Sequence, residues 1–146
     1  MAKIRPSLRH KARCLAVQAI YQWQLAEASP AEIQREFYDR SLPDKVDLDY
    51  FSVLLQGVTK DKDRIDAQYT HLLDRPLKEI GPVELAILRL ATFELLERMD
   101  IPFRVVINEA LRLAKLFGAE DGFKYINAVL DQVARKTRAT ESREKR

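Results

Sequence analysis

A thiol and an imidazole close to the N-terminus are the first candidates for chemistry. His10 and Cys14 are four residues apart, so a helix would place them on one face. A thiol beside an imidazole is the arrangement of an activated nucleophile, but no glycine turn that would form an oxyanion hole lies nearby. We therefore interpret Cys14 as a small packing residue. His71 and His10 both lack a histidine partner at metal-ligand spacing.

The remaining sequence shows no signature of an active site. It contains no glycine-rich phosphate loop, no His-Glu-x-x-His and no kinase or hydrolase motif. A single cysteine forms neither an internal disulfide nor a thiolate metal site. Carboxylates mostly have a basic residue one helical turn away, as Glu109 has Arg112, which is typical of solvated ion pairs. We predict a protein that is not an enzyme and has no cofactor.

Positive charge is concentrated at the two ends of the chain. Residues 1–26 contain five basic residues and no acid, and residues 135–146 contain six basic residues and two acids. The whole chain has a net charge of +3, so residues 27–134 carry −6. Basic ends on an acidic body are typical of a protein that binds a polyanion. We favour this role for the N-terminal end, whose charges continue into a helix, and interpret the C-terminal charges as a solvated run. We expect residues 1–7 and 135–146 to be flexible.

The leading segment combines cations with flat side chains. Arg9 and Arg13 are one helical turn apart, a spacing at which both can contact neighbouring phosphates of one strand. His10 and Tyr21 lie on an adjacent face and offer stacking groups. Cations that follow the backbone, with rings that stack on unpaired bases, are typical of proteins that bind single-stranded RNA. Half-buried packing is an equally good interpretation of Tyr21.

A second candidate segment lies near the C-terminus. Asp121 to Tyr125 combine a helix start, which can hold a phosphate, with a cation at Lys124 and a ring at Tyr125. The Asp121 carboxylate can accept a hydrogen bond from a base edge. We expect Tyr125 to face the same RNA strand as Arg9 and Arg13, although half-buried packing is an equal alternative for its ring.

Length and composition predict one globular domain. The chain has 146 residues, 47% hydrophobic and 32% charged, which excludes a disordered chain. Its apolar runs are too short for a membrane span, and its N-terminus lacks the apolar stretch of a secretory signal. We expect a soluble, cytoplasmic protein. Monomer and homodimer are both compatible with the sequence.

Helical periodicity, together with the breaks between periodic segments, predicts an all-α fold of six or seven helices. We expect helices over residues 8–26, 31–40, from about 47, 62–73, 82–96, 105–117 and from 120–121. Ser29-Pro30 opens the second of these, and Gly81-Pro82 opens the fifth with the proline just inside the helix. The first follows Ser7 as N-cap, and Gly118 ends the sixth. The 85–96 segment is apolar on nearly every side, which predicts a central helix.

Taken together, these segments resemble the NusB family of bacterial transcription antitermination factors. The resemblance spans about residues 8–134 and is carried by residues 9–24, 54–58, 81–91, 106–121 and 124–131. Its most specific parts are the strings Val106-Ile107-Asn108-Glu109-Ala110 and Phe117-Gly118-Ala119-Glu120-Asp121. Any one of these strings alone is a weak signal, but their combination and order are specific.

The resemblance implies an all-helical fold of two packed bundles that binds boxA, a short single-stranded RNA element, together with the ribosomal protein NusE. It also implies a larger complex with NusA, NusG and RNA polymerase. By position, the RNA surface maps to Arg9, His10, Lys11, Arg13, Tyr21, Asp121, Lys124 and Tyr125. The NusE contact maps near Glu84. The head contains His10 and Lys11 among its arginines, and Tyr125 stands where phenylalanine is common, which affects base preference.

Three other interpretations remain. The same module precedes the catalytic domain of ribosomal RNA cytosine methyltransferases, but a glycine-rich cofactor loop and catalytic cysteines are missing here. The second is a helical interaction protein whose basic ends are incidental. An RNA-binding module of this kind can also act in ribosome assembly. A helix-turn-helix DNA binder is the third, but we find no short turn with an exposed reading helix.

Overall fold

Helices account for most of the computed structural model, which describes residues 5–119 and 122–139. This part of the chain contains seven α-helices and two short 3-10 turns and no strand, which confirms the all-α prediction. The elements are α1 (Pro6–Leu25), α2 (Pro30–Arg40), α3 (Leu48–Lys60), α4 (Lys62–Asp66), η1 (Thr70–Leu72), η2 (Leu77–Glu79), α5 (Pro82–Glu97), α6 (Phe103–Leu116) and α7 (Phe123–Thr137). None of these described helices is long and apolar enough to cross a membrane.

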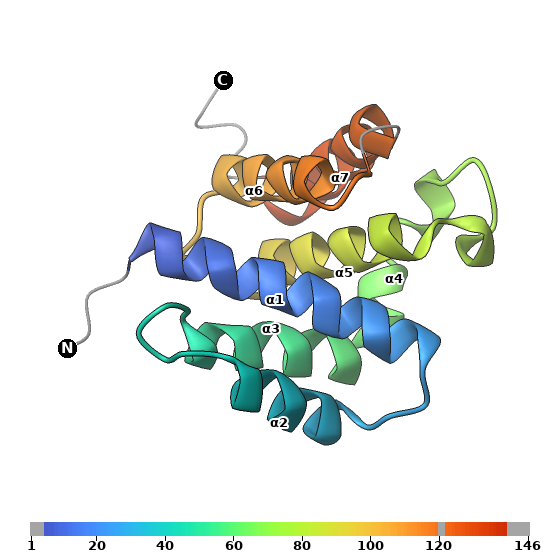
Figure 1. Cartoon of the computed structure of the whole chain (residues 1–146). Helices are drawn as coiled ribbons and strands as arrows, with labels where there is room; N and C mark the ends of the chain where they lie inside the picture. Colours follow the sequence, from blue (N-terminus) through green and yellow to red (C-terminus); the bar gives the residue numbers. More distant parts are fainter. Residues whose placement is uncertain (1–4, 120–121, 140–146) are drawn as a thin grey trace.

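Two helices, α1 and α5, lie at the centre of the molecule (Figure 1). Helix α1 packs against α2, α3 and α5, and α5 in turn packs against α3, α4, α6 and α7. Figure 1 shows α2 and α3 on one side of α1 and α6 and α7 on the other. The fold is therefore two helical groups joined where α1 meets α5, as the resemblance implied.

Helix α5 is buried along nearly its whole length, as its sequence predicts. Its buried apolar side chains belong to a single hydrophobic core. Every described α-helix except α4 contributes at least two residues to this core. The three polar residues that interrupt it, Arg89, Thr92 and Glu94, are also buried. Buried charges are costly unless they are paired, so Arg89 and Glu94 require partners from other helices.

The observed helix starts follow capping chemistry. The Ser29 hydroxyl accepts a hydrogen bond from the Glu32 N–H at 3.2 Å, and the Asp47 carboxylate accepts one from the Tyr50 N–H at 3.0 Å. The first helix differs from our expectation, because it begins at Pro6 rather than after Ser7. Proline suits this position, since the first N–H of a helix has no intrahelical partner.

The expected helix over residues 62–73 is wrong beyond its first turns. Helix α4 ends at Asp66, and a 3-10 turn follows at Thr70–Leu72. Between them, the fully buried Tyr69 donates its hydroxyl to the Asp66 carboxylate at 2.5 Å. This contact holds the chain in a turn. The segment contains residues of modest helix propensity, so ending the helix here costs little free energy.

The packed fold extends further toward the C-terminus than expected. Residues 135–137 belong to α7, and the Arg138 side chain is only 3% exposed. The prediction of a flexible tail from residue 135 is therefore wrong for residues 135–138, and Pro6 and Ser7 are likewise helical. Residues 1–4 and 140–146 lie outside the described part of the chain.

Gly57 permits the close approach of α3 to α5. A methyl group on its Cα would overlap the ring of Phe93 on α5. We expect Gly57→Ala to lower the free energy of unfolding by about 1–3 kcal/mol, because the ring and its helix must shift. Urea denaturation followed by circular dichroism measures this loss. Val53→Ala, at an exposed position of α3, is the control; equal losses in both variants would contradict the packing argument.

Candidate nucleic-acid interface

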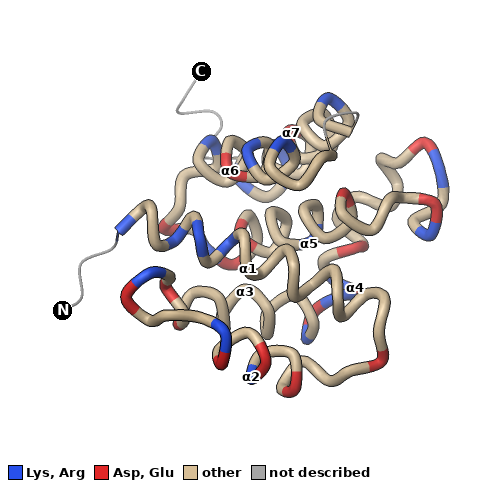
Figure 2. Tube along the Cα trace, in the orientation of Figure 1, with Lys and Arg blue, Asp and Glu red and all other residues tan. Residues whose placement is uncertain are grey.

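The first part of the candidate interface is the basic head, which we define as Arg9, His10, Lys11 and Arg13. All four lie in the N-terminal half of α1, where Figure 2 shows Lys and Arg gathered on the helix. Lys11 is exposed, Arg9 and His10 are partly exposed, and Arg13 is buried. The structure therefore presents only part of the head to an incoming strand.

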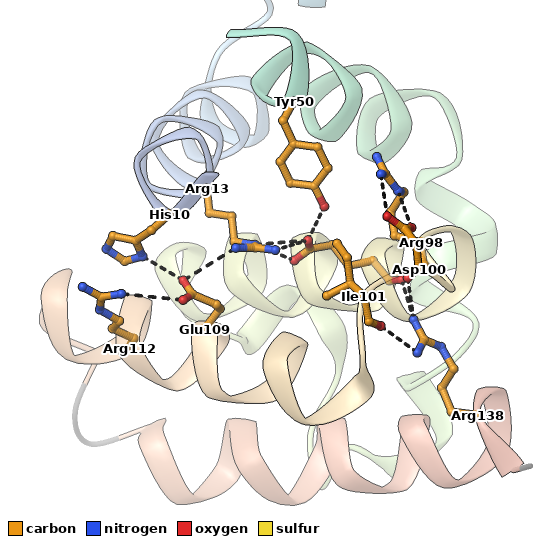
Figure 3. A network of polar contacts seen from close by, with 10 residues as sticks. His10, Arg13, Tyr50, Arg98, Asp100, Ile101, Glu109, Arg112 and Arg138 are labelled. Atoms are coloured by element: carbon orange, nitrogen blue, oxygen red, sulfur yellow. Dashed lines mark hydrogen bonds and ion pairs between the residues drawn. The ribbon is translucent and has the colours of Figure 1, made fainter. Parts of the chain in front are cut away.

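Arg13 is not the surface cation that its spacing from Arg9 predicts. It is 4% exposed, and its Nε donates to both carboxylate oxygens of Glu94 at 3.1 Å while its Nη2 donates at 2.9 Å (Figure 3). The Tyr50 hydroxyl donates to the same carboxylate. Burial opposes the charge on Arg13, but the attraction and hydrogen bonds of Glu94 outweigh it and raise the pKa of Arg13. The prediction of a phosphate-gripping pair is corrected for this residue.

Arg9 lies on the ring of Tyr50, which the buried Arg13–Glu94 pair holds in place through the Tyr50 hydroxyl. Its guanidinium carbon is 4.1 Å from the centroid of the Tyr50 ring, and that of Arg98 is 5.0 Å away. Burial and the adjacent Glu94 raise the pKa of Tyr50 well above its usual range. The ring therefore stays neutral and provides a platform for cations. Arg13 positions this platform rather than contacting a ligand itself.

His10 is tied to α6 by a carboxylate (Figure 3). Its Nδ1 donates to Oε2 of Glu109 at 2.7 Å, and its Nε2 lies 3.5 Å from the Sγ of Cys14. Glu109 also pairs with Arg112 at 3.6 Å and with Arg13 at 3.8 Å. The expectation of a simple solvated pair between Glu109 and Arg112 is therefore incomplete, because Glu109 also holds the head against α6.

The thiol–imidazole contact does form, but it does not activate the thiol. Burial, followed by the nearby Glu109 carboxylate, raises the pKa of Cys14. The reactive thiolate is disfavoured as a result. The observed geometry fits the interpretation of Cys14 as a packing residue.

We expect iodoacetamide to alkylate Cys14 more slowly in the native protein at pH 8 than in the same chain unfolded in urea. The raised pKa leaves less thiolate at that pH, and the half-buried side chain is also less accessible. Mass spectrometry of timed samples across a pH series measures the rate, and the midpoint of its pH profile should lie above that of the unfolded chain. A faster reaction in the native state would contradict the structure.

Tyr21 lies away from the basic head. Eight residues separate it from Arg13, which is about 12 Å along a helix. Tyr21 is 38% exposed and lines an open groove of about 540 Å³ with Val17, Leu25, Phe37, Val83 and Phe117 among other residues. The structure thus places Tyr21 in a largely apolar groove between α1, α2 and the ends of α5 and α6.

The second part of the interface is a cleft of about 180 Å³ where α5 and α7 begin. We call it the Tyr125 cleft; its lining residues are Arg75, Ile80, Gly81, Glu84, Gly122 and Tyr125. The guanidinium carbon of Arg75 is 5.1 Å from the centroid of the Tyr125 ring. Burial, followed by the nearby Asp74 carboxylate, raises the pKa of Tyr125. The structure therefore brings Glu84 and Tyr125 together.

Two other residues of this region were expected at the interface. Lys124 is exposed in the first turn of α7. Asp121 lies outside the described residues. Arg75 was not anticipated, because its position in the loop before η2 carries no periodic or motif signal.

The basic head and the Tyr125 cleft lie at opposite ends of α5. Arg13 pairs with Glu94 near the C-terminal end of that helix, whereas Tyr125 shares its cleft with Glu84 near the N-terminal end. Ten residues of helix correspond to roughly 15 Å. The residues expected to face one RNA strand thus lie in two separate clusters, and one strand can contact both only by running along the molecule.

Comparison with known proteins gives one consistent family. A family model described as the NusB family matches residues 10–135. "Transcription antitermination protein NusB" of Alcanivorax borkumensis is 52% identical over 141 residues, covering 97% of this chain and 94% of the relative. The protein of the same name from Shewanella amazonensis is 52% identical over 130 residues, covering 89% and 97%. The solved structure of T. maritima NusB superposes with a TM-score of 0.78 at 25% identity, covering 92% and 93%.

Proposed function

Because the chain belongs to the NusB family, we propose that it is a transcription antitermination factor that binds boxA-type single-stranded RNA together with NusE. In this role it joins NusA, NusG and RNA polymerase in the cytoplasm and supports processive transcription of ribosomal RNA operons. The names of its relatives describe transcription factors rather than enzymes. Binding alone performs this role.

The observation that carries the RNA proposal is the presence of accessible cations at both clusters, together with a flat group at the Tyr125 cleft. At the basic head, Lys11 is exposed and Arg9 is partly exposed, while the Tyr50 ring beneath Arg9 is only 2% exposed, so this cluster contributes cations. At the Tyr125 cleft, Lys124 is exposed and Arg75 lies on Tyr125. Cations attract the phosphates of any strand, and stacking requires bases that are unpaired. This combination supports single-stranded rather than duplex RNA.

Within this proposal the candidate residues have different tasks. Lys11, Lys124 and the exposed parts of Arg9 and His10 contact phosphates, and Tyr125 supports the Arg75 guanidinium on which a base stacks. Arg13 acts indirectly, because Glu94 holds it in the core. Tyr21 and Asp121 remain in the proposed interface on the resemblance alone.

The acidic body supports the proposal of a basic protein partner. Residues 27–134 carry a net charge of −6, and Figure 2 shows acidic residues along α2, on the side of α1 away from α6 and α7. NusE-type proteins are basic, so such a surface can hold one without repelling RNA at the other clusters. A NusE affinity that rises with added salt would contradict this assignment, because screening weakens attraction between opposite charges.

A titration of boxA RNA with and without purified NusE tests the function. We expect tighter binding of boxA than of a scrambled RNA of the same composition, and a further gain when NusE is present. Equal affinities for both RNAs under both conditions would favour the alternative of a helical interaction protein with incidental basic ends.

We expect the logarithm of RNA affinity to fall with the logarithm of salt concentration at a slope of roughly −3, if about four phosphates of a single strand are neutralised. Lys11→Gln should weaken binding to boxA and to scrambled RNA alike and should reduce the slope by about 0.7. Fluorescence anisotropy between 50 and 200 mM KCl, roughly the range in which such contacts are sensitive, measures both. Lys60→Gln, exposed at the end of α3, is the control and should leave the slope unchanged.

A further inference from the structure

We propose that the Tyr125 cleft binds one guanine base and that the Glu84 carboxylate recognises its Watson–Crick edge. This inference rests on the proposed function only in taking single-stranded RNA as the ligand. It gives Glu84 a role different from the protein contact that the resemblance implies. The argument follows from what surrounds Glu84 in the cleft.

Glu84 extends over two positions that lack a side chain. It lies in the first turn of α5, and its side chain occupies the space that a Cβ on Gly81 or Gly122 would fill. Among the described residues its carboxylate has no hydrogen bond or ion pair, in contrast to Glu94 and Glu109. The two glycines therefore make room for an acceptor that is left free to bind a ligand.

A cation stacked on a ring forms the wall beside this carboxylate. The Arg75 guanidinium lies 5.1 Å from the Tyr125 ring centroid, and the Arg75 side chain is 46% exposed. A base can stack on the outer face of a guanidinium plane as it does on an aromatic ring. The cleft thus offers a flat surface beside a hydrogen-bond acceptor, which suits a planar ligand that carries donors.

Among the four RNA bases, guanine best matches a carboxylate. An ionised carboxylate only accepts hydrogen bonds, and it can accept two side by side. Guanine presents two adjacent donors on its Watson–Crick edge, N1–H and the N2 amino group. Uracil presents one ring N–H, and adenine and cytosine present one amino group next to an acceptor that faces the carboxylate unfavourably. Glu84 therefore favours guanine.

The charges around the cleft favour a neutral base over a basic side chain of a protein partner. Arg75 lines the cleft and pairs with Asp74 at 3.0 Å, which offsets its charge, and Lys124 is exposed in the first turn of α7 nearby. The N-termini of α5 and α7, helices of 16 and 15 residues, add partial positive charge at the same place. Lys124 and the two helix N-termini would attract the phosphates that flank a bound guanine, which a basic side chain of a protein partner does not carry.

The test uses an eight-nucleotide oligouridine with one central guanosine and the same RNA with inosine, which lacks the N2 amino group. We expect the wild-type protein to bind the guanosine RNA about tenfold more tightly, which lies within the range that a good bidentate contact to a base contributes. Glu84→Gln should reduce this ratio to about one. Glu79→Gln, exposed in the turn before α5, should preserve it. A 2-aminopurine RNA, which lacks N1–H, needs no variant and should also bind less tightly than the guanosine RNA.

Several outcomes would overturn the inference without affecting the proposed function. Equal binding of the guanosine and inosine RNAs by the wild-type protein, with boxA still preferred over scrambled RNA, removes guanine recognition alone. Loss of NusE affinity in Glu84→Gln with an unchanged guanosine-to-inosine ratio assigns Glu84 to a protein contact instead. A failure of the proposed function appears differently, as equal binding of boxA and scrambled RNA with and without NusE.

Discussion

Replacing Glu94 by glutamine is expected to lower the free energy of unfolding by about 3–5 kcal/mol, the usual cost of removing one partner of a buried ion pair. The side chains of Arg13 and Glu94 are only 4% and 1% exposed. Glutamine keeps the shape of the side chain but removes its charge, so the buried Arg13 guanidinium keeps only the longer contact to Glu109, at 3.8 Å, as a counter-ion. The Tyr50 hydroxyl also loses its charged acceptor.

Urea denaturation of the wild-type and variant proteins measures this loss. The matched control is Glu97→Gln in the same helix, because the Glu97 side chain is 41% exposed and pairs with Arg64 at the surface. A surface pair contributes about 0–1 kcal/mol, so the control should remain close to the wild type. Equal stability of Glu94→Gln and Glu97→Gln would contradict the buried pair.

The double variant Arg13→Met, Glu94→Leu separates the cost of an unpaired charge from the value of the pair. Well-packed apolar replacements of a buried ion pair are often neutral or stabilising, so we expect the double variant to recover most of the loss. Its RNA affinity is also informative. If Arg13 acts only by positioning Tyr50 and Arg9, the double variant should keep the salt slope of the wild type, since no phosphate contact has been removed.

Local chemistry in the sequence predicts much of the fold. Pro82 just inside α5, Ser29 before α2 and Gly118 after α6 mark helix ends correctly, and Gly118 has the positive φ of 76° that a helix-ending glycine adopts. These features depend on neighbours within a few residues. The break after Asp66 was missed because it depends on burial of Tyr69 in the core, which has no local signal.

The candidate site is less predictable, since its partners are distant in sequence. Arg13 and Glu94 are 81 residues apart, and spacing along α1 says only that Arg9 and Arg13 are one turn apart, not which of them faces the core. A usable signal was present, because Arg13 lies beside Ala12 and Ala16 on the face that α1 buries. The Tyr125 cleft has no such signal: it forms only when the first turns of α5 and α7 meet.

Arg138→Met is expected to lower the free energy of unfolding by about 3 kcal/mol, because the Arg138 guanidinium donates to four backbone carbonyls. A hydrogen bond to a charged group contributes about 1.5–3 kcal/mol, and the contributions of neighbouring bonds are not additive. Nε donates to Leu95 O at 2.8 Å and Nη1 to Ile101 O at 2.9 Å. Nη2 donates to the carbonyls of Glu94 and Arg98 at 3.1 and 2.8 Å (Figure 3). Three of these carbonyls lie at the C-terminal end of α5, where helix carbonyls lack partners and a cation is favoured.

Thermal unfolding measures the loss, which corresponds to a fall in Tm of roughly 10 °C for a domain of this size. The matched control is Arg135→Met, because the Arg135 side chain is 61% exposed and pairs only across one turn with Asp131 at 3.1 Å. Such an i,i+4 pair contributes about 0.3–0.5 kcal/mol. Similar losses in the two variants would mean that the carbonyl contacts of Arg138 do not support α5.

A pair of truncations separates this structural role from the charge of the C-terminal segment. A chain that ends at Ala139 keeps Arg138 and should keep the stability of the wild type, whereas a chain that ends at Thr137 should lose about as much as Arg138→Met. Equal stability of the two truncations would contradict the structure. The chain that ends at Ala139 lacks Arg143, Lys145 and Arg146 but keeps Arg138. If its RNA binding has the same salt slope as that of the full chain, the electrostatic contacts belong to the basic head and the Tyr125 cleft. A shallower slope would assign part of these contacts to the removed residues.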